Sequence, residues 1–309
     1  MDVLFMGTPD FSVLALESLI KEHNVKAVIT QPDKPKGRGK KILFTPVKEK
    51  AIEHNIPVYQ PKTLKDDDFI EKLKEINADI FVVAAYGQLL PETVLKMPKY
   101  GCINIHASLL PEYRGAAPIQ RAIIDGKTKT GVTIMYMEKK LDSGDMLLKQ
   151  EIEITPNDTY GSLHDKMSVV GASLIIKTLK LLSEGNLKAE KQDSSLSTYA
   201  YMIDKETGHI KWDKTSDEII NLIRGLNPSP CAYTNYCGET FKIYAAEKTK
   251  TDKNSDFGEI ISVSPKKGFV VKTADSAIII TQMQAKGGKK MSAADYLRGH
   301  EIKEGIILQ

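Results

Sequence analysis

Short apolar runs alternate with amphipathic stretches over the first two thirds of the chain. Runs typical of buried strands are followed by stretches whose apolar residues recur at the spacing of a helix. The expected strands are 3–7, 25–31, 58–60, 79–86, 102–107, 131–137 and 145–154, and the expected helices are 11–22, 46–55, 66–76, 118–125 and 159–182. This alternation predicts an α/β fold with a Rossmann-like, mostly parallel sheet.

The pattern changes in the last third of the chain. From residue 190 to residue 207 the hydrophobic periodicity lapses into a Ser-rich, charged stretch, which predicts a linker. Beyond it, a helix is expected at 215–226 and another at 292–298, with strands at 240–246, 258–264, 268–273 and 277–283. We therefore expect a first domain over 1–189 and a small OB-like β-barrel over 208–309.

The composition narrows the class of protein. With 309 residues, 41% hydrophobic and 27% charged, the sequence is that of a globular protein long enough for two domains. It contains no apolar run near the roughly 20 residues of a membrane span and no secretory signal pattern, which predicts a cytoplasmic protein that does not bind membranes. The cysteines Cys102, Cys231 and Cys237 lack metal-ligand spacing, so neither a disulfide nor a metal site is expected.

Positive charge is concentrated in one segment, although the net charge of the chain is only +3. Five cations stand close together between residues 31 and 42, namely Lys34, Lys36, Arg38, Lys40 and Lys41. Prolines and glycines interrupt this segment, which predicts a flexible loop without regular helix or strand. A charge run is often only a solvated surface, but glycines that let the backbone approach a partner favour contact with phosphates.

The strand expected at 102–107 carries the candidate chemistry. Its side chains alternate between two faces, so Asn104 and His106 share one face. The turn before the strand expected at 145–154 supplies Asp142, which a parallel sheet could bring to the same strand end. An amide can stabilise an oxyanion, an imidazole can move a proton near neutral pH, and a carboxylate can orient the imidazole. The three residues are therefore candidates for catalysis of acyl transfer.

A simpler interpretation of the same residues stays open. A polar pair on a buried strand is more often a satisfied hydrogen-bonding pair than a catalytic one. The loop that follows, at 108–120, favours a binding site, because ligands of open α/β sheets bind beyond the carboxyl ends of the strands. The first turn, Gly7-Thr-Pro-Asp10, lacks the glycine pattern of a dinucleotide site.

Six motifs spread over the chain resemble those of the methionyl-tRNA formyltransferase family. They are Met6-Gly-Thr-Pro-Asp-Phe11, Gln31-Pro-Asp-Lys-Pro-Lys-Gly-Arg-Gly-Lys-Lys41, Ala85-Tyr-Gly-Gln-Leu-Leu-Pro91, Cys102-Ile-Asn-Ile-His-Ala-Ser-Leu-Leu-Pro111, Arg114-Gly-Ala-Ala-Pro-Ile-Gln120 and Leu141-Asp-Ser-Gly-Asp145. The Asn, His, Ser-Leu-Leu-Pro and Asp elements resemble all formyltetrahydrofolate-dependent formyltransferases and hydrolases. The cationic segment, the Arg-Gly-Ala-Ala-Pro-Ile-Gln run and the C-terminal barrel resemble the tRNA-directed branch. Ala107 departs from members that carry glycine there.

The resemblance implies the formyltransferase fold, with 10-formyltetrahydrofolate as the formyl donor and the α-amine of methionyl initiator tRNA as the acceptor. Asn104 and His106 would stabilise the oxyanion, and Asp142 would orient His106 and favour its charged form. The folate would lie between two sides of a pocket, Gln88, Leu89 and Leu90 on one and Met137 and Leu141 on the other, above Ser108, Leu109, Leu110 and Pro111. The chain is expected to need no metal and to be a monomer without an obligate protein partner.

The resemblance also implies how the tRNA is selected. Initiator tRNA would present a mismatched first base pair, beside which the cationic segment inserts, with Arg38 against a base or phosphate.

Two other classes of function remain as alternatives. A formyltransferase acting on a sugar nucleotide or a purine precursor, or a formyltetrahydrofolate hydrolase, would keep Asn104, His106 and Asp142 but would have no use for a cationic segment and a barrel. A non-catalytic tRNA-binding protein would account for the cationic segment and the barrel. It would leave the three polar residues unexplained.

Overall fold

A computed structural model of the chain describes residues 1–36 and 41–309, which form two compact units. The first unit comprises Met1–Gly115, Thr130–Glu153 and His164–Ala200. The second comprises Ala116–Lys129, Ile154–Leu163 and Tyr201–Gln309. Each unit therefore draws on segments that are far apart in the sequence. Among the described residues, no helix is both long and apolar enough to cross a membrane.

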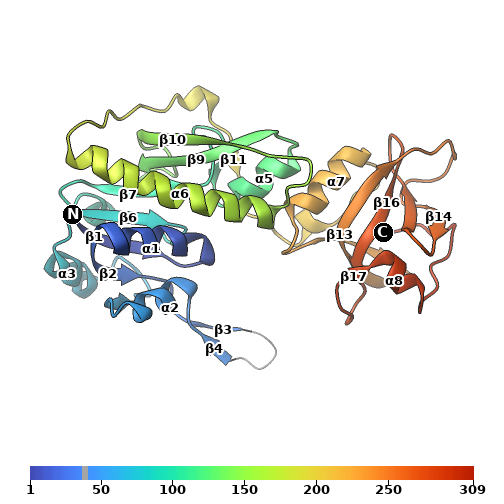
Figure 1. The fold of residues 1–309 in the computed structure, drawn as a ribbon, viewed down its shortest axis with the longest axis horizontal. Coiled ribbons are helices and arrows are strands. Elements are labelled where there is room, and N and C mark those ends of the chain that lie inside the picture. The colour runs from blue at the N-terminus through green and yellow to red at the C-terminus, as the bar shows by residue number, and fades with distance from the viewer. Residues whose placement is uncertain (37–40) are drawn as a thin grey trace. The chain divides into compact units, whose positions relative to one another are not determined.

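The first unit is built around a seven-stranded sheet with the order β10-β9-β7-β6-β1-β2-β5 (Figure 1). Its strands are β1 (Asp2–Gly7), β2 (Asn24–Ile29), β5 (Val58–Tyr59), β6 (Ile80–Ala84), β7 (Cys102–His106), β9 (Lys129–Tyr136) and β10 (Met146–Glu153). The five strands from β5 to β7 pair in parallel, and β9 is antiparallel to β7. The predicted α/β fold with a mostly parallel sheet is confirmed.

Helices cover both faces of this sheet. They are α1 (Val13–Glu22), α2 (Pro46–Glu53), α3 (Asp67–Ile76), α4 (Glu92–Leu95) and α6 (Tyr160–Ser183). On one face, Leu73 of α3 and Val94 of α4 belong to a buried cluster with Phe81 of β6. On the other, α6 crosses the sheet (Figure 1), and a Cβ added to its Gly171 would lie 2.9 Å from the side chain of Ile105.

Local sequence signals set the ends of these helices. The carboxylate of Asp66 accepts hydrogen bonds from the backbone N–H groups of Asp68 and Phe69, so α3 begins with a side-chain cap. The helix ends at Asn77, whose φ of 47° is left-handed. The helix expected at 66–76 is confirmed.

The cationic segment is more regular than its prolines and glycines suggested. β3 (Lys34–Lys36) and β4 (Lys41–Leu43) form an antiparallel hairpin, a two-stranded sheet of their own. The expectation of a loop without strands was therefore wrong for these residues. Pro35 is tolerated because both strands of such a sheet are edges, where the missing N–H is not needed. Arg38 and Lys40 lie outside the described residues.

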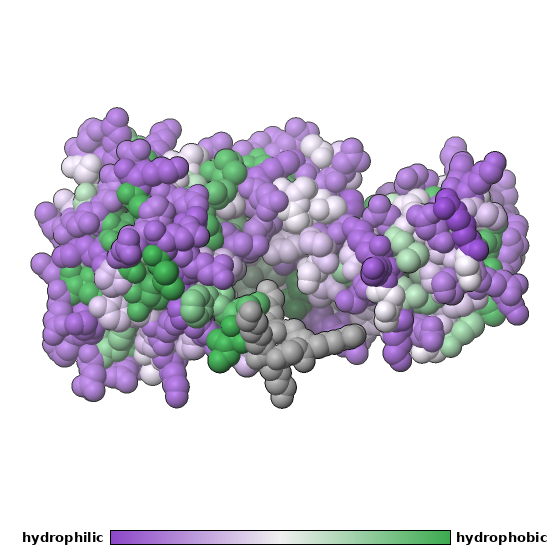
Figure 2. Space-filling model, turned by 60° about the horizontal axis from the view of Figure 1, so that its bottom comes forward, coloured by the Kyte–Doolittle hydropathy of each residue, from purple (hydrophilic) through white to green (hydrophobic). Residues whose placement is uncertain are grey.

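One lysine of α2 holds the base of this hairpin. The ammonium group of Lys48 forms an ion pair with Asp33, just before β3, and donates a hydrogen bond of 2.7 Å to Oε1 of Gln60. It also lies 4.0 Å from the centroid of the Phe44 ring, just after β4. Ile42, Leu43 and Phe44 are exposed, and Figure 2 shows hydrophobic surface beside the hairpin on an otherwise mostly hydrophilic face.

The segment expected to be a linker is partly ordered. It contains a short 3-10 helix (Ser194–Leu196) and β11 (Tyr199–Ala200), which pairs in parallel with β8 (Arg114–Gly115). Residues up to Ala200 belong to the first unit.

The second unit contains an antiparallel sheet with the order β12-β13-β16-β15-β14, in which β17 also pairs with β16. Its strands are β12 (Ala232–Tyr236), β13 (Glu239–Thr249), β14 (Ile260–Ser264), β15 (Gly268–Lys272), β16 (Ala277–Gln284) and β17 (Met291–Ser292). Gln309 exchanges two backbone hydrogen bonds with Asn235 of β12, and Leu308 donates to the carbonyl of Gly258, which precedes β14. The C-terminal residues thus bridge both edges of the sheet, as expected for a small OB-like barrel. The sequence pattern missed β12.

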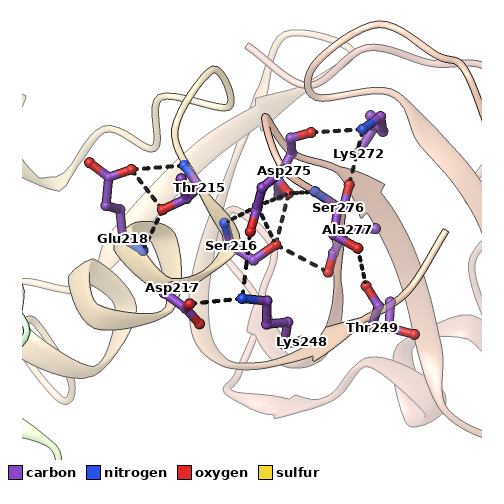
Figure 3. Close-up of polar contacts among 11 residues, drawn as sticks. Thr215, Ser216, Asp217, Glu218, Lys248, Thr249, Lys272, Asp275, Ser276 and Ala277 are labelled. Atoms are coloured by element: carbon purple, nitrogen blue, oxygen red, sulfur yellow. Dashed lines mark hydrogen bonds and ion pairs between the residues drawn. The ribbon is translucent and has the colours of Figure 1, made fainter. Parts of the chain in front are cut away.

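Three helices complete the second unit: α5 (Pro118–Ile124), α7 (Ser216–Gly225) and α8 (Ala293–Leu297). The first turn of α7 is attached to the sheet by side-chain hydrogen bonds (Figure 3). Asp275, between β15 and β16, accepts a bond of 2.7 Å from the backbone N–H of Ser216 and one of 2.9 Å from its hydroxyl. Lys248 of β13 pairs with Asp217 at 2.7 Å and with Asp275 at 3.5 Å.

These contacts predict an acid-sensitive stability of the second unit. The hydrogen bonds from Ser216 lower the pKa of Asp275 from 3.8 to about 2. Because the pKa is lower in the folded state, the stabilisation is fully present above about pH 4 and is lost as the pH falls through about 2. We expect Asp275→Asn to lower the thermal midpoint at pH 7, and the difference from wild type to shrink between about pH 4 and pH 2. Thermal unfolding followed by circular dichroism measures this, and a difference that is constant with pH would contradict it.

Candidate active site

The alternation of side chains along β7 places two polar residues on the same face of the sheet. Cys102 belongs to the buried cluster of α3 and α4, whereas Ile105 packs near Gly171 of α6. Asn104 and His106 share the parity of Cys102 and therefore lie on the α3 and α4 face. Only 5% of His106 is exposed, and Asn104 is half-buried.

The ring of His106 lies between two oxygen atoms. Its Nε2 lies 3.0 Å from the backbone carbonyl oxygen of Tyr113. Because a carbonyl oxygen only accepts hydrogen bonds, this contact fixes the proton on Nε2 and leaves the lone pair of the neutral ring on Nδ1. Nδ1 faces Oδ2 of Asp142 at 3.8 Å, which is beyond hydrogen-bond distance. A proton accepted by Nδ1 would therefore form an imidazolium beside a carboxylate.

Asp142 reaches His106 by a different route from the one expected. β9 is antiparallel to β7, so the chain leaves β9 beside Cys102, to whose carbonyl the N–H of Met137 donates at 2.8 Å. The expectation of a parallel strand end is therefore wrong, and the loop after Met137 folds back toward His106. The backbone N–H of Gly115 donates to Oδ2 of Asp142 at 2.8 Å. Asp142 has a φ of 47°, a left-handed conformation that is uncommon for a residue with a Cβ.

The amide of Asn104 is available to a ligand. It makes no side-chain hydrogen bond to any residue of 1–36 or 41–309. Its neighbour on the same face, Cys102, donates weakly to the carbonyls of Val94 and Leu95, each at 3.6 Å. Burial raises the pKa of the Cys102 thiol to about 12, so this thiol stays protonated at neutral pH and is not a nucleophile.

The two sides expected for a folate pocket contain both buried and exposed side chains. Leu90 belongs to the α3 and α4 cluster, and Met137 packs against the same cluster. Leu89 and Leu141 are 74% and 50% exposed, so each side also presents an apolar side chain to solvent. Gln88 is half-buried, and its amide lies 3.4 Å from the carbonyl of Lys62.

The turn from Ser108 to Pro111 is held mainly by contacts inside the protein. The hydroxyl of Ser108 donates to the carbonyl of Glu112 at 2.6 Å, and its own carbonyl accepts from Thr133 at 2.7 Å. Leu110 forms a buried cluster with Met135 and Met146. Leu109 and Pro111 are only half-buried. The side chains of Ser108 and Leu110 therefore shape the turn.

Sequence reasoning missed four residues that support this site. Tyr113 supplies the carbonyl that binds His106, and its N–H donates a hydrogen bond to the hydroxyl of Thr198. The guanidinium of Arg114 donates to the side-chain amide of Gln192. Tyr113 and Arg114 lie in the loop 108–120, where the sequence predicts a binding site, so their position was a usable signal. Gln192 and Thr198 lie in the Ser-rich stretch, where no periodicity indicates a buried position.

Three of the five cationic residues, Lys34, Lys36 and Lys41, lie in the two described strands of the hairpin. Lys34 is exposed in β3, and the register of the hairpin pairs Lys36 with Lys41.

Comparison with known proteins identifies relatives along the whole chain. The family described as formyl transferase matches residues 1–179, and the family described as formyl transferase, C-terminal domain, matches residues 202–301. A methionyl-tRNA formyltransferase of Clostridium beijerinckii is 52% identical over 310 residues, with 100% of both chains covered. One of Clostridium botulinum is 51% identical, with 100% of this chain and 99% of the relative covered.

Solved structures with low sequence identity share the fold. An N-formyltransferase of Helicobacter canadensis, in complex with folinic acid and dTDP-3-aminofucose, has a TM-score of 0.68 at 21% identity and covers 94% of this chain and 99% of its own. HypX of Aquifex aeolicus in complex with tetrahydrofolic acid has a TM-score of 0.63 at 16% identity, covering 98% of this chain and 50% of its own.

Proposed function

Because this chain belongs to the methionyl-tRNA formyltransferase family, we propose that Asn104, His106 and Asp142 carry out its formyl transfer. The donor is 10-formyltetrahydrofolate, and the acceptor is the α-amine of methionyl initiator tRNA. The observation that carries the assignment of residues is the placement of Asn104 and His106 on one face of β7, with Asp142 3.8 Å from the imidazole. Formyltransferases of sugar nucleotides or purine precursors are not favoured, because relatives about 50% identical over the full chain are methionyl-tRNA formyltransferases.

The three residues have separate roles in the proposed reaction. The neutral amine attacks the formyl carbon, and Asn104 donates a hydrogen bond to the developing oxyanion. Nδ1 of His106 accepts a proton from the attacking nitrogen, and the carboxylate of Asp142 stabilises the resulting imidazolium. The bond between the formyl carbon and N10 of the folate then breaks, and the imidazolium returns the proton to N10. The protonated ring can also support Asn104 in stabilising the oxyanion.

The folate is proposed to lie beside the α3 and α4 cluster. Leu89 and Leu141 are exposed apolar side chains that could contact a flat ring, and their neighbours Leu90 and Met137 belong to or pack against the buried cluster. Gln88 would contact the edge of the ring, and the turn of Ser108, Leu109, Leu110 and Pro111 would set the shape of the pocket. The reaction as written requires no metal.

The tRNA is proposed to bind to the cationic hairpin and to the second unit. Lys34, Lys36, Arg38, Lys40 and Lys41 would contact the acceptor stem, and the domain 208–309, joined to the domain 1–189 by 190–207, would hold the body of the tRNA. We further propose that the protein is a cytoplasmic monomer that needs no protein partner.

Two substitutions distinguish specific recognition of tRNA by the cationic segment from simple electrostatic attraction. Lys40→Ala removes a point charge, so we expect about threefold weaker use of tRNA and a smaller salt dependence. Arg38→Leu removes a planar group that binds bidentately and stacks, so we expect at least about a tenfold loss at equal ionic strength. Initial rates against tRNA concentration at several salt concentrations measure both effects. If both variants lose formylation rate equally and low salt restores it, the cationic segment contributes only electrostatic attraction.

Separate formylation assays with four acceptors test the proposed function. The protein is incubated with 10-formyltetrahydrofolate and, separately, methionyl initiator tRNA, the same tRNA with a Watson–Crick first pair, an amino-sugar nucleotide and glycinamide ribonucleotide. We expect rapid formylation of the mismatched tRNA, at least about tenfold slower formylation of the paired tRNA, and none of the small acceptors. Equal rates with both tRNAs would contradict the proposed initiator selectivity, and formylation of a small acceptor would contradict the proposed substrate.

A further inference from the structure

A glutamine from the segment 190–207 holds the turn that carries Asp142. The side chain of Gln192 is buried, with only 7% exposed. Its amide nitrogen donates one hydrogen bond of 2.9 Å to the carbonyl of Asp142 and one of 2.7 Å to the carbonyl of Gly144. Both hydrogens of the amide are therefore used on the backbone of the Asp142 turn (residues 141–145).

The other end of the same amide binds the loop that contacts Asp142 from the opposite side. Oε1 of Gln192 accepts hydrogen bonds from Nε and Nη2 of Arg114, at 3.1 and 2.7 Å. Arg114 is itself buried, with 4% exposed. The next residue, Gly115, donates its N–H to Oδ2 of Asp142 at 2.8 Å. The contacts therefore close a ring. It runs from Gln192 through the side chain of Arg114 and the N–H of Gly115 to Asp142, whose carbonyl binds Gln192.

The chain after Gln192 also supports His106. The hydroxyl of Thr198 accepts a hydrogen bond of 2.8 Å from the N–H of Tyr113, whose carbonyl binds His106. The carbonyl of Thr198 accepts from the N–H of Arg114 at 2.9 Å. One short segment therefore contacts both the residue that holds His106 and the turn that carries Asp142.

The conformation of the turn explains why such support is needed. Asp142 and Tyr113 have φ values of 47° and 57°, which are unfavourable for residues with side chains. Strained residues of this kind keep their conformation only where surrounding contacts enforce it. A Cβ on Gly144 would lie 1.9 Å from the carbonyl oxygen of Tyr136, so only glycine fits where the turn passes the end of β9.

We propose that Gln192 is a positioning residue for formyl transfer, which acts by holding the carboxylate of Asp142 at His106. This inference rests on the proposed role of Asp142. Gln192 does not touch His106, and it acts only through the backbone of the turn and through Arg114. Its removal should slow the chemical step and leave the binding of both substrates nearly unchanged.

Two substitutions and a matched control test the proposal. Gln192→Glu is nearly isosteric and keeps an acceptor for Arg114, but it loses both N–H donors to the turn. Gln192→Met removes every hydrogen bond and keeps the length of the side chain. The control is Gln150→Met, an exposed glutamine of β10. Circular dichroism and thermal midpoints establish which variants are folded, and Gln192→Glu is the variant expected to fold best.

The expected result is a separation of kcat from KM. In single-turnover assays at saturating substrates, both Gln192 variants should transfer formyl groups at least about tenfold more slowly, because small displacements of catalytic groups are costly. KM for tRNA and for 10-formyltetrahydrofolate should change less than about twofold, and Gln150→Met should match wild type. A folded Gln192→Glu protein with an unchanged transfer rate overturns the proposal.

A double-mutant cycle with Asp142→Asn tests whether Gln192 acts through Asp142. If it does, adding Gln192→Glu to Asp142→Asn should slow transfer by less than about twofold more. Losses that multiply would overturn the positioning role while leaving the role of Asp142 intact. If Asp142→Asn alone retains nearly full activity, the proposed role of Asp142 fails, and the proposal for Gln192 fails with it.

Discussion

Replacing His106 with alanine is expected to slow formyl transfer by at least about 100-fold while leaving the affinity for tRNA nearly unchanged. The expectation follows from the ring's position, with Nε2 held by the carbonyl of Tyr113 and Nδ1 facing Asp142. The thiol of Cys102, on the same face of β7, cannot replace it, because burial raises its pKa to about 12. Without the imidazole the attacking nitrogen loses its proton acceptor.

The measurement for His106→Ala is the single-turnover rate, together with the dissociation constant for tRNA. The matched control is His54→Ala, which alters an exposed histidine at the end of α2. The control should retain wild-type activity. A loss of less than about tenfold for His106→Ala would exclude a direct catalytic role and leave His106 as a satisfied buried polar residue.

For Asp142→Asn we also expect a loss of about 100-fold in transfer rate. The substitution keeps an oxygen that can accept the N–H of Gly115, so the turn can retain its conformation. It removes the negative charge 3.8 Å from Nδ1 of His106, and with it the stabilisation of the imidazolium. The loss should therefore appear in kcat, with KM for both substrates little changed.

The control for this variant is Asp68→Asn, an exposed aspartate in the first turn of α3. It should change neither rate nor affinity. If Asp142 were only a turn residue, Asp142→Asn would lower the thermal midpoint and leave the transfer rate of the folded protein near that of wild type. That outcome would contradict the proposed chemistry.

The periodicity of apolar residues along the sequence was sufficient to predict much of the fold. The alternation at 102–107 predicted a strand with Asn104 and His106 on one face, and the structure has them there on β7. The helix expected at 66–76 likewise corresponds to α3. Such features depend on neighbours a few residues away, and the period of apolar residues records them.

The sequence did not reveal the direction and pairing of strands that are distant in the chain. The sequence supplied Asp142 as a candidate but gave no basis for β9 running antiparallel to β7, and the route expected for Asp142 was wrong. Similarly, the prolines of the cationic segment predicted a loop, whereas β3 and β4 form a two-stranded sheet in which an edge proline is tolerated. Both outcomes depend on which segment lies beside which.

By itself, the sequence determined the alternating β and α elements of the first two thirds, most strands of the last third and the residue types proposed for formyl transfer. Only the tertiary structure decided that Gln192, 50 residues after Asp142, holds the turn of Asp142, and that the backbone of Gln309 bonds to that of Asn235 at the β12 edge of the second sheet. The physical reason is that a buried amide satisfies its hydrogen bonds wherever the folded chain brings partners within reach. A polar, Ser-rich stretch has no period that reveals such a partner before the chain is folded.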